Sequence, residues 1–401
     1  MTNSKKLRLN VTYGLKLMVV ILVLACCGYA YSPVKSAPPP TRDWTLYPAV
    51  VEIDRPPGDI FAVSDPHAHY LRLTSVLQAA GLMGVSSAAP GSELHYNWVG
   101  GNAVLVVTGD LIDKLPTGSL NVINMLRELQ ESAAGRGGRV IVTMGNHEAE
   151  FLSKNDVFKK KTKDFRDELA AAEIAQKNPN LNPDRVANCE GDLGQWLCQL
   201  PVAARVGDWF FAHAGYTQGR SIEKISKDIA DDFILNNNGF KTGQLIGPES
   251  ILEAGLDNTG PEGKPWVFVG QPGTTPENLL KQYTNALGVR HIVQGHKPGK
   301  VDFKHGLERP RGEMFQAYGL LFLIDADMGE GTDNFNDDSN GAALRIQVNW
   351  IAGSSTAVPE PPPEPPCFTI TTKAIAIKKD GSQKPFWEGT VQKRESGAPC
   401  R

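Results

Sequence analysis

Residues 103–114 read Ala-Val-Leu-Val-Val-Thr-Gly-Asp-Leu-Ile-Asp-Lys, and this stretch decides the fold. Its apolar, β-branched first half is typical of a short buried strand, and Gly109-Asp110 ends that strand with a turn and a carboxylate. The same order returns at 140–148, where Val-Ile-Val-Thr-Met is followed by Gly-Asn-His-Glu. Strands that repeatedly end in a polar side chain predict an α/β scaffold that gathers ligands from distant parts of the sequence.

Five blocks of this kind follow one another along the chain. They are Ser64-Asp65-Pro66-His67, Gly109 to Lys114, Gly145-Asn146-His147-Glu148, His213-Ala214-Gly215 and Gly295-His296-Lys297-Pro298. Taken singly, an Asp after a strand is usually a turn residue or a helix cap. Taken together, carboxylate and amide oxygens with imidazole nitrogens are the ligands that a pair of divalent cations such as manganese, iron or zinc needs. The five blocks therefore predict a two-metal site.

The blocks resemble those of the calcineurin-like metallophosphoesterases, and more closely those of the phosphoprotein phosphatases. That pattern runs Gly-Asp-x-His-Gly, Gly-Asp-x-x-Asp-Arg-Gly, Gly-Asn-His-Glu, His-Gly-Gly and Gly-His. Residues 194–197, 201–202 and 206–215 are similar to the Shewanella-like branch of these phosphatases. The resemblance covers residues 58–330 and implies a calcineurin-like sandwich of two mixed β-sheets flanked by helices. Residues 325–329 resemble the closing segment of the phosphatases, which implies a strand end near the site.

The resemblance also implies a function for each site residue. The implied metal ligands are Asp65 and His67 on the first metal, Asp110 bridging both metals, and Asn146, His213 and His296 on the second metal. His147 would be the general acid that protonates the leaving oxygen, and Asp113 would orient it. The implied substrate contacts are Lys114, Asn146 and His69. The implied reaction is hydrolysis of a phosphomonoester, with phosphoproteins favoured, by attack of a metal-bridging hydroxide.

The chain departs from the phosphatase pattern mainly on the substrate side. The departing residues are Ser64, Ala68, His69, Lys114, Leu115 and Ala214. Lys114 replaces an Arg and keeps its charge, but it lacks the planar fork that grips two oxygens. A second phosphate-binding arginine is missing at 266–268, where the sequence reads Trp-Val-Phe, and Arg220 is a candidate replacement. Two alternatives therefore stay open: an enzyme acting on nucleotides or other small phosphoesters, and a non-enzymatic fold that binds a partner.

The N-terminus predicts export. Basic residues precede the apolar run at 17–25, whose length suits a secretory signal better than a full membrane span. Three outcomes stay open: cleavage after Ala30, lipid attachment at Cys26, and an uncleaved signal anchor. The expected location is periplasmic, secreted or membrane-anchored facing outward. The formal net charge of -3 gives no sign of a nucleic-acid partner, so the membrane is expected to be met only through the N-terminal segment.

Four cysteines remain beyond the targeting segment, and an oxidising compartment would pair them. Three pairings are possible, and proximity in sequence favours Cys189–Cys198 and Cys367–Cys400.

The predicted domains follow from two proline-rich segments. They are a signal peptide or anchor at 1–30, a tether at 31–43, the catalytic domain at 44–353, a linker at 354–366 and a small Cys-bounded β appendage at 367–401. The alternative for the last segment is a partly disordered tail.

Short apolar runs and helical stretches alternate inside the catalytic domain. The expected strands are 60–63, 103–108, 140–144, 202–205, 209–212, 289–293, 320–325 and 342–350, and the expected helices are 119–133, 155–176 and 276–286. Gly207-Asp208 predicts a tight hairpin turn between two of these strands.

Overall fold

Two six-stranded sheets form the centre of the molecule. The computed structural model describes residues 42–87, 94–154, 162–235, 239–256, 266–268, 273–303, 307–329, 341–352 and 367–394. The first sheet has the order β1 (Val50–Ile53), β7 (Ala203–Val206), β8 (Trp209–Ala212), β9 (His291–Gln294), β13 (Leu321–Leu323) and β12 (Phe315–Ala317). The second has the order β16 (Gln383–Arg394), β15 (Cys367–Lys378), β14 (Ala342–Ala352), β2 (Ile60–Val63), β5 (Val104–Val107) and β6 (Arg139–Val142). Both sheets are mixed, which confirms the expected architecture.

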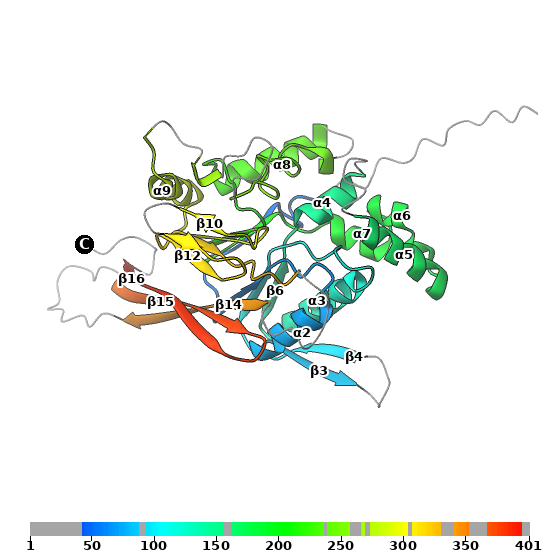
Figure 1. Cartoon of the computed structure of the whole chain (residues 1–401), viewed down its shortest axis with the longest axis horizontal. Helices are drawn as coiled ribbons and strands as arrows, with labels where there is room; N and C mark the ends of the chain where they lie inside the picture. The colour runs from blue at the N-terminus through cyan, green and yellow to red at the C-terminus, as the bar shows by residue number, and fades with distance from the viewer. Residues whose placement is uncertain are drawn as a thin grey trace, which may run out of the picture. The chain divides into compact units, whose positions relative to one another are not determined.

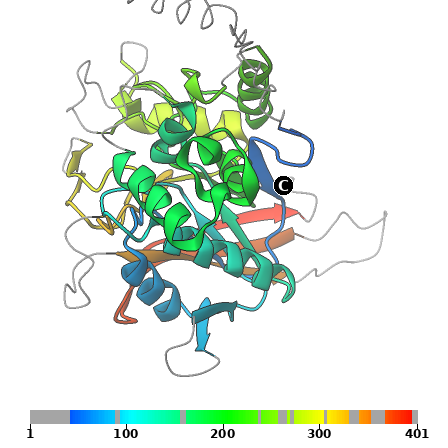
Figure 2. The same ribbon diagram turned by 90° about the vertical axis from the view of Figure 1, so that its right-hand side faces the viewer.

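Helices cover the outer faces of the two sheets. The helices are α2 (Tyr70–Ala79), α3 (Ser119–Ala134), α4 (Asn146–Ser153), α5 (Lys163–Gln176), α6 (Pro183–Ala187), α7 (Gly191–Cys198), α8 (Ile222–Leu235) and α9 (Pro276–Leu287), with short 3-10 turns η2 (Pro179–Leu181), η3 (Gly239–Lys241) and η4 (Trp266–Phe268). Figure 1 shows α8 and α9 on one side of the sheets and α2 and α3 on the other, and Figure 2 shows the same layering after a quarter turn. Two small hairpins complete the fold, β3 (Met83–Ser87) with β4 (Leu94–Trp98) and β10 (Val301–Asp302) with β11 (Glu308–Arg309).

Side-chain alternation along the central strands builds two apolar layers. In β2, Ile60 and Ala62 join the layer between the sheets, whereas Phe61 and Val63 pack beneath the helices. All four are buried, and β5 follows the same rule. A strand buried on both faces reads as a continuous apolar run, which is why these strands were visible in the sequence. The hairpin at Gly207-Asp208 is also confirmed, since β7 and β8 pair with Val206 opposite Trp209.

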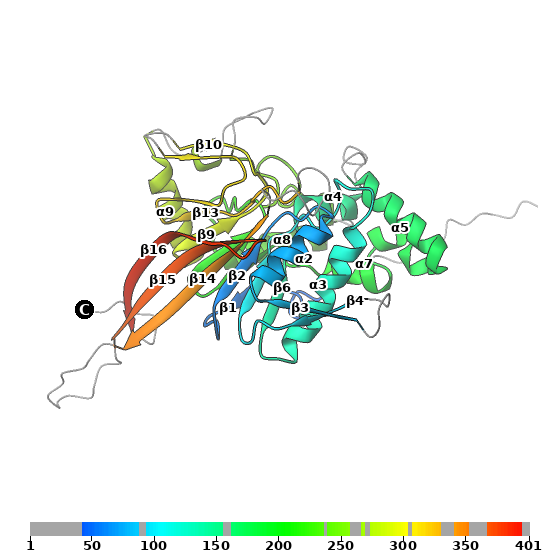
Figure 3. The ribbon, with the colours of Figure 1, turned by 60° about the horizontal axis from the view of Figure 1, so that its bottom comes forward.

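The C-terminal segment is not a separate appendage. Figure 3 shows β14, β15 and β16 running side by side, and the residues of β15 pair with β14 from Ala342–Lys378 to Ala352–Phe368. Trp387 of β16 reaches across to the first sheet, with ring centroids 5.9 Å from Trp209. The segment is β structure as expected, but it extends the second sheet, because β15 pairs with β14 and β14 pairs with β2. The linker at 354–366 lies outside the described residues.

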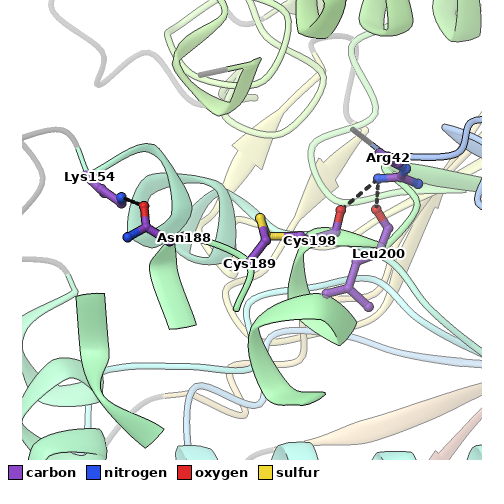
Figure 4. Close-up of a disulfide and its surroundings, with 6 residues drawn as sticks. All are labelled: Arg42, Lys154, Asn188, Cys189, Cys198 and Leu200. Atoms are coloured by element: carbon purple, nitrogen blue, oxygen red, sulfur yellow. Dashed lines mark hydrogen bonds between the residues drawn. A yellow bond between two sulfur atoms is a disulfide. The ribbon is translucent and has the colours of Figure 1, made fainter. Parts of the chain in front are cut away.

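One predicted disulfide is present. Cys189 and Cys198 are bonded, with Cα atoms 5.7 Å apart, and the bond joins the segment after α6 to the end of α7 (Figure 4). Arg42 donates to the carbonyl oxygens of Cys198 (3.2 Å) and Leu200 (2.9 Å), which fixes the end of α7 to the start of the domain. The pairing Cys367–Cys400 and the targeting segment 1–30 lie outside the described residues.

No helix within the described ranges is long and apolar enough to span a membrane.

Candidate metal centre and active site

The five sequence blocks meet at one edge of the sandwich. Asp65 and His67 follow β2, Asp110 and Asp113 follow β5, Asn146 and His147 open α4 just after β6, His213 follows β8, and His296 follows β9. Strands β2, β5 and β6 are mutually parallel, and so are β8 and β9. Parallel strands deliver their carboxyl ends to the same edge, so both sheets bring their ligands to one place.

The backbone turns sharply at several of these residues. Asp65, His67, Asp110 and His296 have φ values of 52°, 41°, 52° and 72°, in the left-handed region that costs an L-residue roughly 1–3 kcal/mol in strained cases. Cross-links between the turns hold this conformation, because the N–H of His67 donates to the Asp110 carbonyl (2.9 Å) and that of Gly295 to the His213 carbonyl (2.9 Å). These turns direct the side chains toward one another at the end of the strands.

Two glycines leave room for the carboxylates. A Cβ on Gly145 would lie 2.1 Å from Asp110 Oδ1, and a Cβ on Gly295 would lie 2.2 Å from Asp65 Oδ2. At both positions a carboxylate approaches the backbone too closely for any side chain, which explains the glycines that open the third and fifth blocks.

Asp110 lies between two groups of donor atoms. Its Oδ2 is 3.5 Å from His67 Nε2 and 3.3 Å from His213 Nε2. On the first side, His67 Nε2 is also 3.9 Å from Asp65 Oδ1. On the second side, His213 Nε2 is 3.1 Å from Asn146 Oδ1 and 3.0 Å from His296 Nδ1. All six predicted ligands therefore come together, in the two groups expected and with Asp110 shared.

The three imidazoles are oriented as metal ligands require. His67 Nδ1 lies 3.2 Å from the Ile112 carbonyl, His213 Nδ1 lies 2.8 Å from that of Thr108, and His296 Nε2 lies 3.1 Å from that of Glu253. A ring nitrogen that donates to a carbonyl leaves the other nitrogen as the lone-pair donor. In each ring that second nitrogen faces Asp110 or its neighbours, so the residues fit a pair of divalent cations.

The three imidazoles differ in protonation state, because burial and nearby charges shift their pKa values in different directions. Burial holds the pKa of His67 and of His296 well below the ordinary value, so both rings stay neutral and ready to ligate. Burial also opposes the charged form of His213, but the carboxylates of Asp110 and Asp65 outweigh it and raise its pKa to about 10. Metal binding at His213 must therefore displace a proton.

His147 lies between Asp113 and Asp110, and its ring also groups with His67 and Asp110 closely enough to hold a metal ion. Its Nδ1 is 3.4 Å from Asp113 Oδ2, and its Nε2 is 3.8 Å from Asp110 Oδ2. Its side chain is 12% exposed, compared with 5% for His67 and 0% for His213. Burial would lower its pKa, but the charge of Asp110 and the bond to Asp113 raise it to about 9. The Asp113 carboxylate is itself fixed by the Phe165 N–H (3.1 Å) at the start of α5.

Sequence reasoning missed two glutamates behind the ligands. The buried carboxylate of Glu148 accepts N–H bonds from Gly145 (2.8 Å), Asp110 (2.9 Å), Leu111 (2.8 Å) and Ile112 (3.3 Å), which pins two of the ligand loops together. Glu150 accepts from Asn146 Nδ2 (3.1 Å), which turns the Asn146 oxygen toward His213. The last letter of Gly-Asn-His-Glu was the available signal for Glu148, whereas nothing in the sequence marked Glu150.

The predicted substrate contacts fare differently. Lys114 is exposed directly after Asp113. Burial raises the pKa of Asp325 well above its ordinary value, and the charge of Lys114 opposes part of that shift. His69 is the residue directly before α2, and it is fully buried, so its expected contact with the substrate stays a prediction. Arg220 is not available as a clamp, since it binds the Thr217 carbonyl (3.0 Å) and Asp228 (3.2 Å).

A sandwich of two mixed sheets whose strand ends converge on two imidazole and carboxylate groups defines a metal-dependent phosphoesterase. Residues 58–300 match the family model described as calcineurin-like phosphoesterase, and the chain belongs to this family. The family uses a dinuclear metal site, and the structure contains two groups of His and Asp residues that could hold metal ions.

Relatives and solved structures agree with this assignment. The chain is 36% identical over 288 residues to an uncharacterized protein of Schizosaccharomyces pombe, covering 68% of this chain and 74% of the relative. It is 29% identical over 160 residues to Shewanella-like protein phosphatase 1 of Plasmodium berghei, covering 39% of each chain. The fold is similar to that of the cold-active protein tyrosine phosphatase of a psychrophilic Shewanella, with a TM-score of 0.53 at 17% identity, covering 85% of this chain and 82% of that chain.

Proposed function

We propose that this protein is an exported dinuclear-metal phosphatase that hydrolyses phosphomonoesters, with phosphoproteins as its substrates. The observation that carries the proposal is the pair His147–Asp113, because ligands alone would serve a structural metal site as well. An imidazole held by a carboxylate beside the metal ligands supplies the proton that a phosphomonoester's leaving oxygen needs. The likeness to a Shewanella-like protein phosphatase supports phosphoprotein substrates over small molecules.

The metal ligands, the His147–Asp113 pair and Lys114 each contribute a different part of the proposed reaction. Manganese, iron or zinc ions held by the six ligands would supply an activated water and neutralise the charge on the phosphoryl oxygens. His147 Nε2 donates its proton to the departing oxygen, and Asp113 keeps the ring in the orientation and charge state that this transfer requires. Lys114 lies exposed beside the site and attracts the substrate's negative charge.

The disulfide supports the proposed compartment. A bond between Cys189 and Cys198 persists where the surroundings are oxidising, as in the periplasm or outside the cell. Fractionation of cells that express the full chain would test this. Recovery of the protein in the cytosol with both thiols free to react would contradict export.

The first test uses p-nitrophenyl phosphate and the fragment that begins at Tyr31. The metal-stripped protein should be inactive and should recover turnover with manganese, whereas His147→Ala and Asp110→Asn should each lose at least about 100-fold in kcat. A panel of phosphopeptides, nucleotides and small phosphoesters then fixes the substrate class. Preference for nucleotides over phosphopeptides would replace the phosphoprotein assignment, and full activity of His147→Ala would contradict the proposed mechanism.

A further inference from the structure

His296 lies at the centre of a tight turn. Its φ of 72° is in the left-handed region, and the N–H of Lys297 donates back to the Gly295 carbonyl (2.9 Å), which closes a three-residue turn around the imidazole. Three-residue turns with a positive φ at the central residue are rare and strained. A residue keeps such a conformation only where the surrounding structure holds it. The loop that carries His296 therefore needs support from outside the loop.

The three backbone carbonyls directly after this turn all accept hydrogen bonds from one segment, which begins at the end of β11. Arg309 Nη1 donates to the carbonyls of Lys297 and Gly299. The Gly312 N–H donates to the carbonyl between them, that of Pro298 (2.8 Å). Arg309 is the last residue of β11 and is only 1% exposed, so water does not compete for its bonds. A buried guanidinium therefore supports the loop of a predicted second-metal ligand.

The same guanidinium binds a second segment of the metal centre. Arg309 Nη2 donates to the Asp325 carbonyl, just after β13, and its Nε donates to the Glu313 carbonyl (2.9 Å). The segment after Asp325 reaches a predicted first-metal ligand, because a Cβ on Gly329 would lie 2.4 Å from His67 Cδ2. One arginine thus connects the loop of a second-metal ligand with a segment that packs against a first-metal ligand.

The charge of Arg309 also faces the acidic side of the centre. Burial lowers the pKa of Arg309, and the carboxylates of Asp325 and Asp65 oppose part of that shift. A buried cation is costly unless hydrogen bonds and opposite charges compensate it, and both are present here. Four carbonyl acceptors on separate segments suit the rigid planar fork of arginine, which the flexible point charge of lysine does not reproduce.

We propose that Arg309 is a positioning residue of the metal centre, whose planar fork holds His296 in the orientation that a second metal ion needs. The inference rests on the proposed function, because that reaction uses a dinuclear centre, and it assigns a role to a residue outside the five sequence blocks. Arg309 acts through the carbonyls of the His296 loop. Its replacement should therefore loosen the second metal group more than the first, since His67 keeps its own backbone bond to the Asp110 carbonyl (2.9 Å).

The test measures manganese binding to the metal-stripped full chain by competition with a chelator, in the wild type, Arg309→Lys and Arg42→Lys. Arg42 is the matched control, because it also donates to four backbone carbonyls, and none of them lies in a loop that carries a predicted ligand. Arg309→Lys should weaken the second manganese ion roughly 10- to 100-fold and the first by less than about threefold, the loss seen when a group that orients a ligand is removed. Arg42→Lys should bind both ions as the wild type does.

Electron paramagnetic resonance adds a readout that a loss of stability alone does not change. Two manganese ions that lie close together broaden each other's resonance, whereas an isolated bound ion gives a sharp signal. At the manganese concentration that saturates the wild type, the wild type and Arg42→Lys should show the broadened spectrum. Arg309→Lys should show the sharp signal of a singly occupied centre.

Wild-type affinity for both ions in Arg309→Lys would overturn the proposal, and so would an equal loss of affinity in Arg42→Lys. Arg309→Met, which removes the charge as well, should weaken the second ion at least as much as Arg309→Lys. The lysine variant keeps the buried charge, so the test does not depend on the folding of the methionine variant. Manganese binding is read without turnover. A wild type that binds two ions, loses the second in Arg309→Lys and hydrolyses no phosphomonoester would refute the proposed function and support the role of Arg309.

Discussion

Asp110 shows how one residue can be fixed from several sides at once. Its N–H donates to Glu148 (2.9 Å), its Oδ1 accepts from the His147 N–H (3.0 Å), and its Oδ2 faces the imidazoles of both metal groups. The carboxylate therefore cannot rotate without losing bonds in two other loops. This is the preorganisation that a bridging ligand requires.

A methyl group at Gly145 should disturb the bridging carboxylate directly. Gly145→Ala places a Cβ 2.1 Å from Asp110 Oδ1, and the bond from His147 prevents an easy retreat. We expect metal affinity to fall at least about 10-fold, in the range seen when groups that orient ligands are removed. Gly243→Ala is the control, since nothing lies within 4 Å of its added Cβ. Equal manganese affinity in the two variants, measured by competition with a chelator, would contradict this account of Asp110.

The pH dependence of kcat should report the Asp113–His147 pair. His147 must be protonated to act as the acid, so activity should fall as the pH rises through its pKa, which the carboxylates of Asp110 and Asp113 raise to about 9. Asp113→Asn removes one of these charges and should move the basic limb of the profile to lower pH by roughly one unit. A basic limb that stays in place would show that another group controls it.

The residues that could be predicted from the sequence are those that belong to a recognisable local motif. Asp65, Asp110 and His213 each follow a strand, and a strand end is recognisable from a few neighbours. Glu150 acts through a contact with Asn146 that forms only after folding, so no local pattern marks it. His69 lies two residues after His67, and the sequence does not show that its side chain is fully buried.

At the scale of elements, the central strands were predictable and the connections were not. Strands β2 and β8 begin and end where the apolar runs do, because burial on both faces demands continuous apolar sequence. Helices α6 and α7 are short, and their apolar residues show no long helical period. The proline-rich linker before the C-terminal hairpin predicts a separate appendage, but a linker does not show that the segments on its two sides fold independently.

Removing the C-terminal hairpin should destabilise the whole domain. Ending the chain at residue 352 would remove β15, the strand that pairs with β14. It would also expose apolar residues that pack with Ala374 in the layer between the sheets. It would also remove the ring of Trp387 from Trp209 and Phe322. We expect the truncated protein to be largely insoluble or to melt at least 10 °C lower, a shift of the size that a few kcal/mol produces. A truncated protein with unchanged melting temperature and activity would restore the appendage model.

The disulfide should act on stability more than on chemistry. Closing the short loop between Cys189 and Cys198 constrains the unfolded chain by about 2–3 kcal/mol in the loop-entropy model. Lys154 at the end of α4 bonds to Asn188 beside the disulfide, so some loosening at the helix of His147 is expected on reduction (Figure 4). We expect dithiothreitol to lower the urea midpoint of the wild type and to leave that of Cys189→Ser/Cys198→Ser unchanged. An unchanged wild-type midpoint would contradict a stabilising bond.

At the scale of the molecule, the metal ions should contribute to the stability of the fold. Burial and the neighbouring charge of Asp110 raise the pKa of Asp65, so these carboxylates are unfavourably close without a cation between them. A ligand that binds only the folded state at 100 times its Kd adds about 2.7 kcal/mol. We expect chelation to lower the melting temperature of the wild type by several degrees and that of Asp110→Asn by much less. A wild-type melting temperature independent of manganese would contradict the site.

The pairing of β14 with β2 also sets the order in which the chain can fold. Ala62, three residues before Asp65, lies opposite Leu344. The strand before the first predicted ligand therefore pairs with a strand almost three hundred residues further along the chain. Closing so long a loop is slow, and folding rates fall as contacts span more of the chain. All six predicted metal ligands, from Asp65 to His296, precede β14 in the chain. We therefore expect the metal centre to reach its final geometry only after β14 has paired with β2, so metal should bind late in refolding.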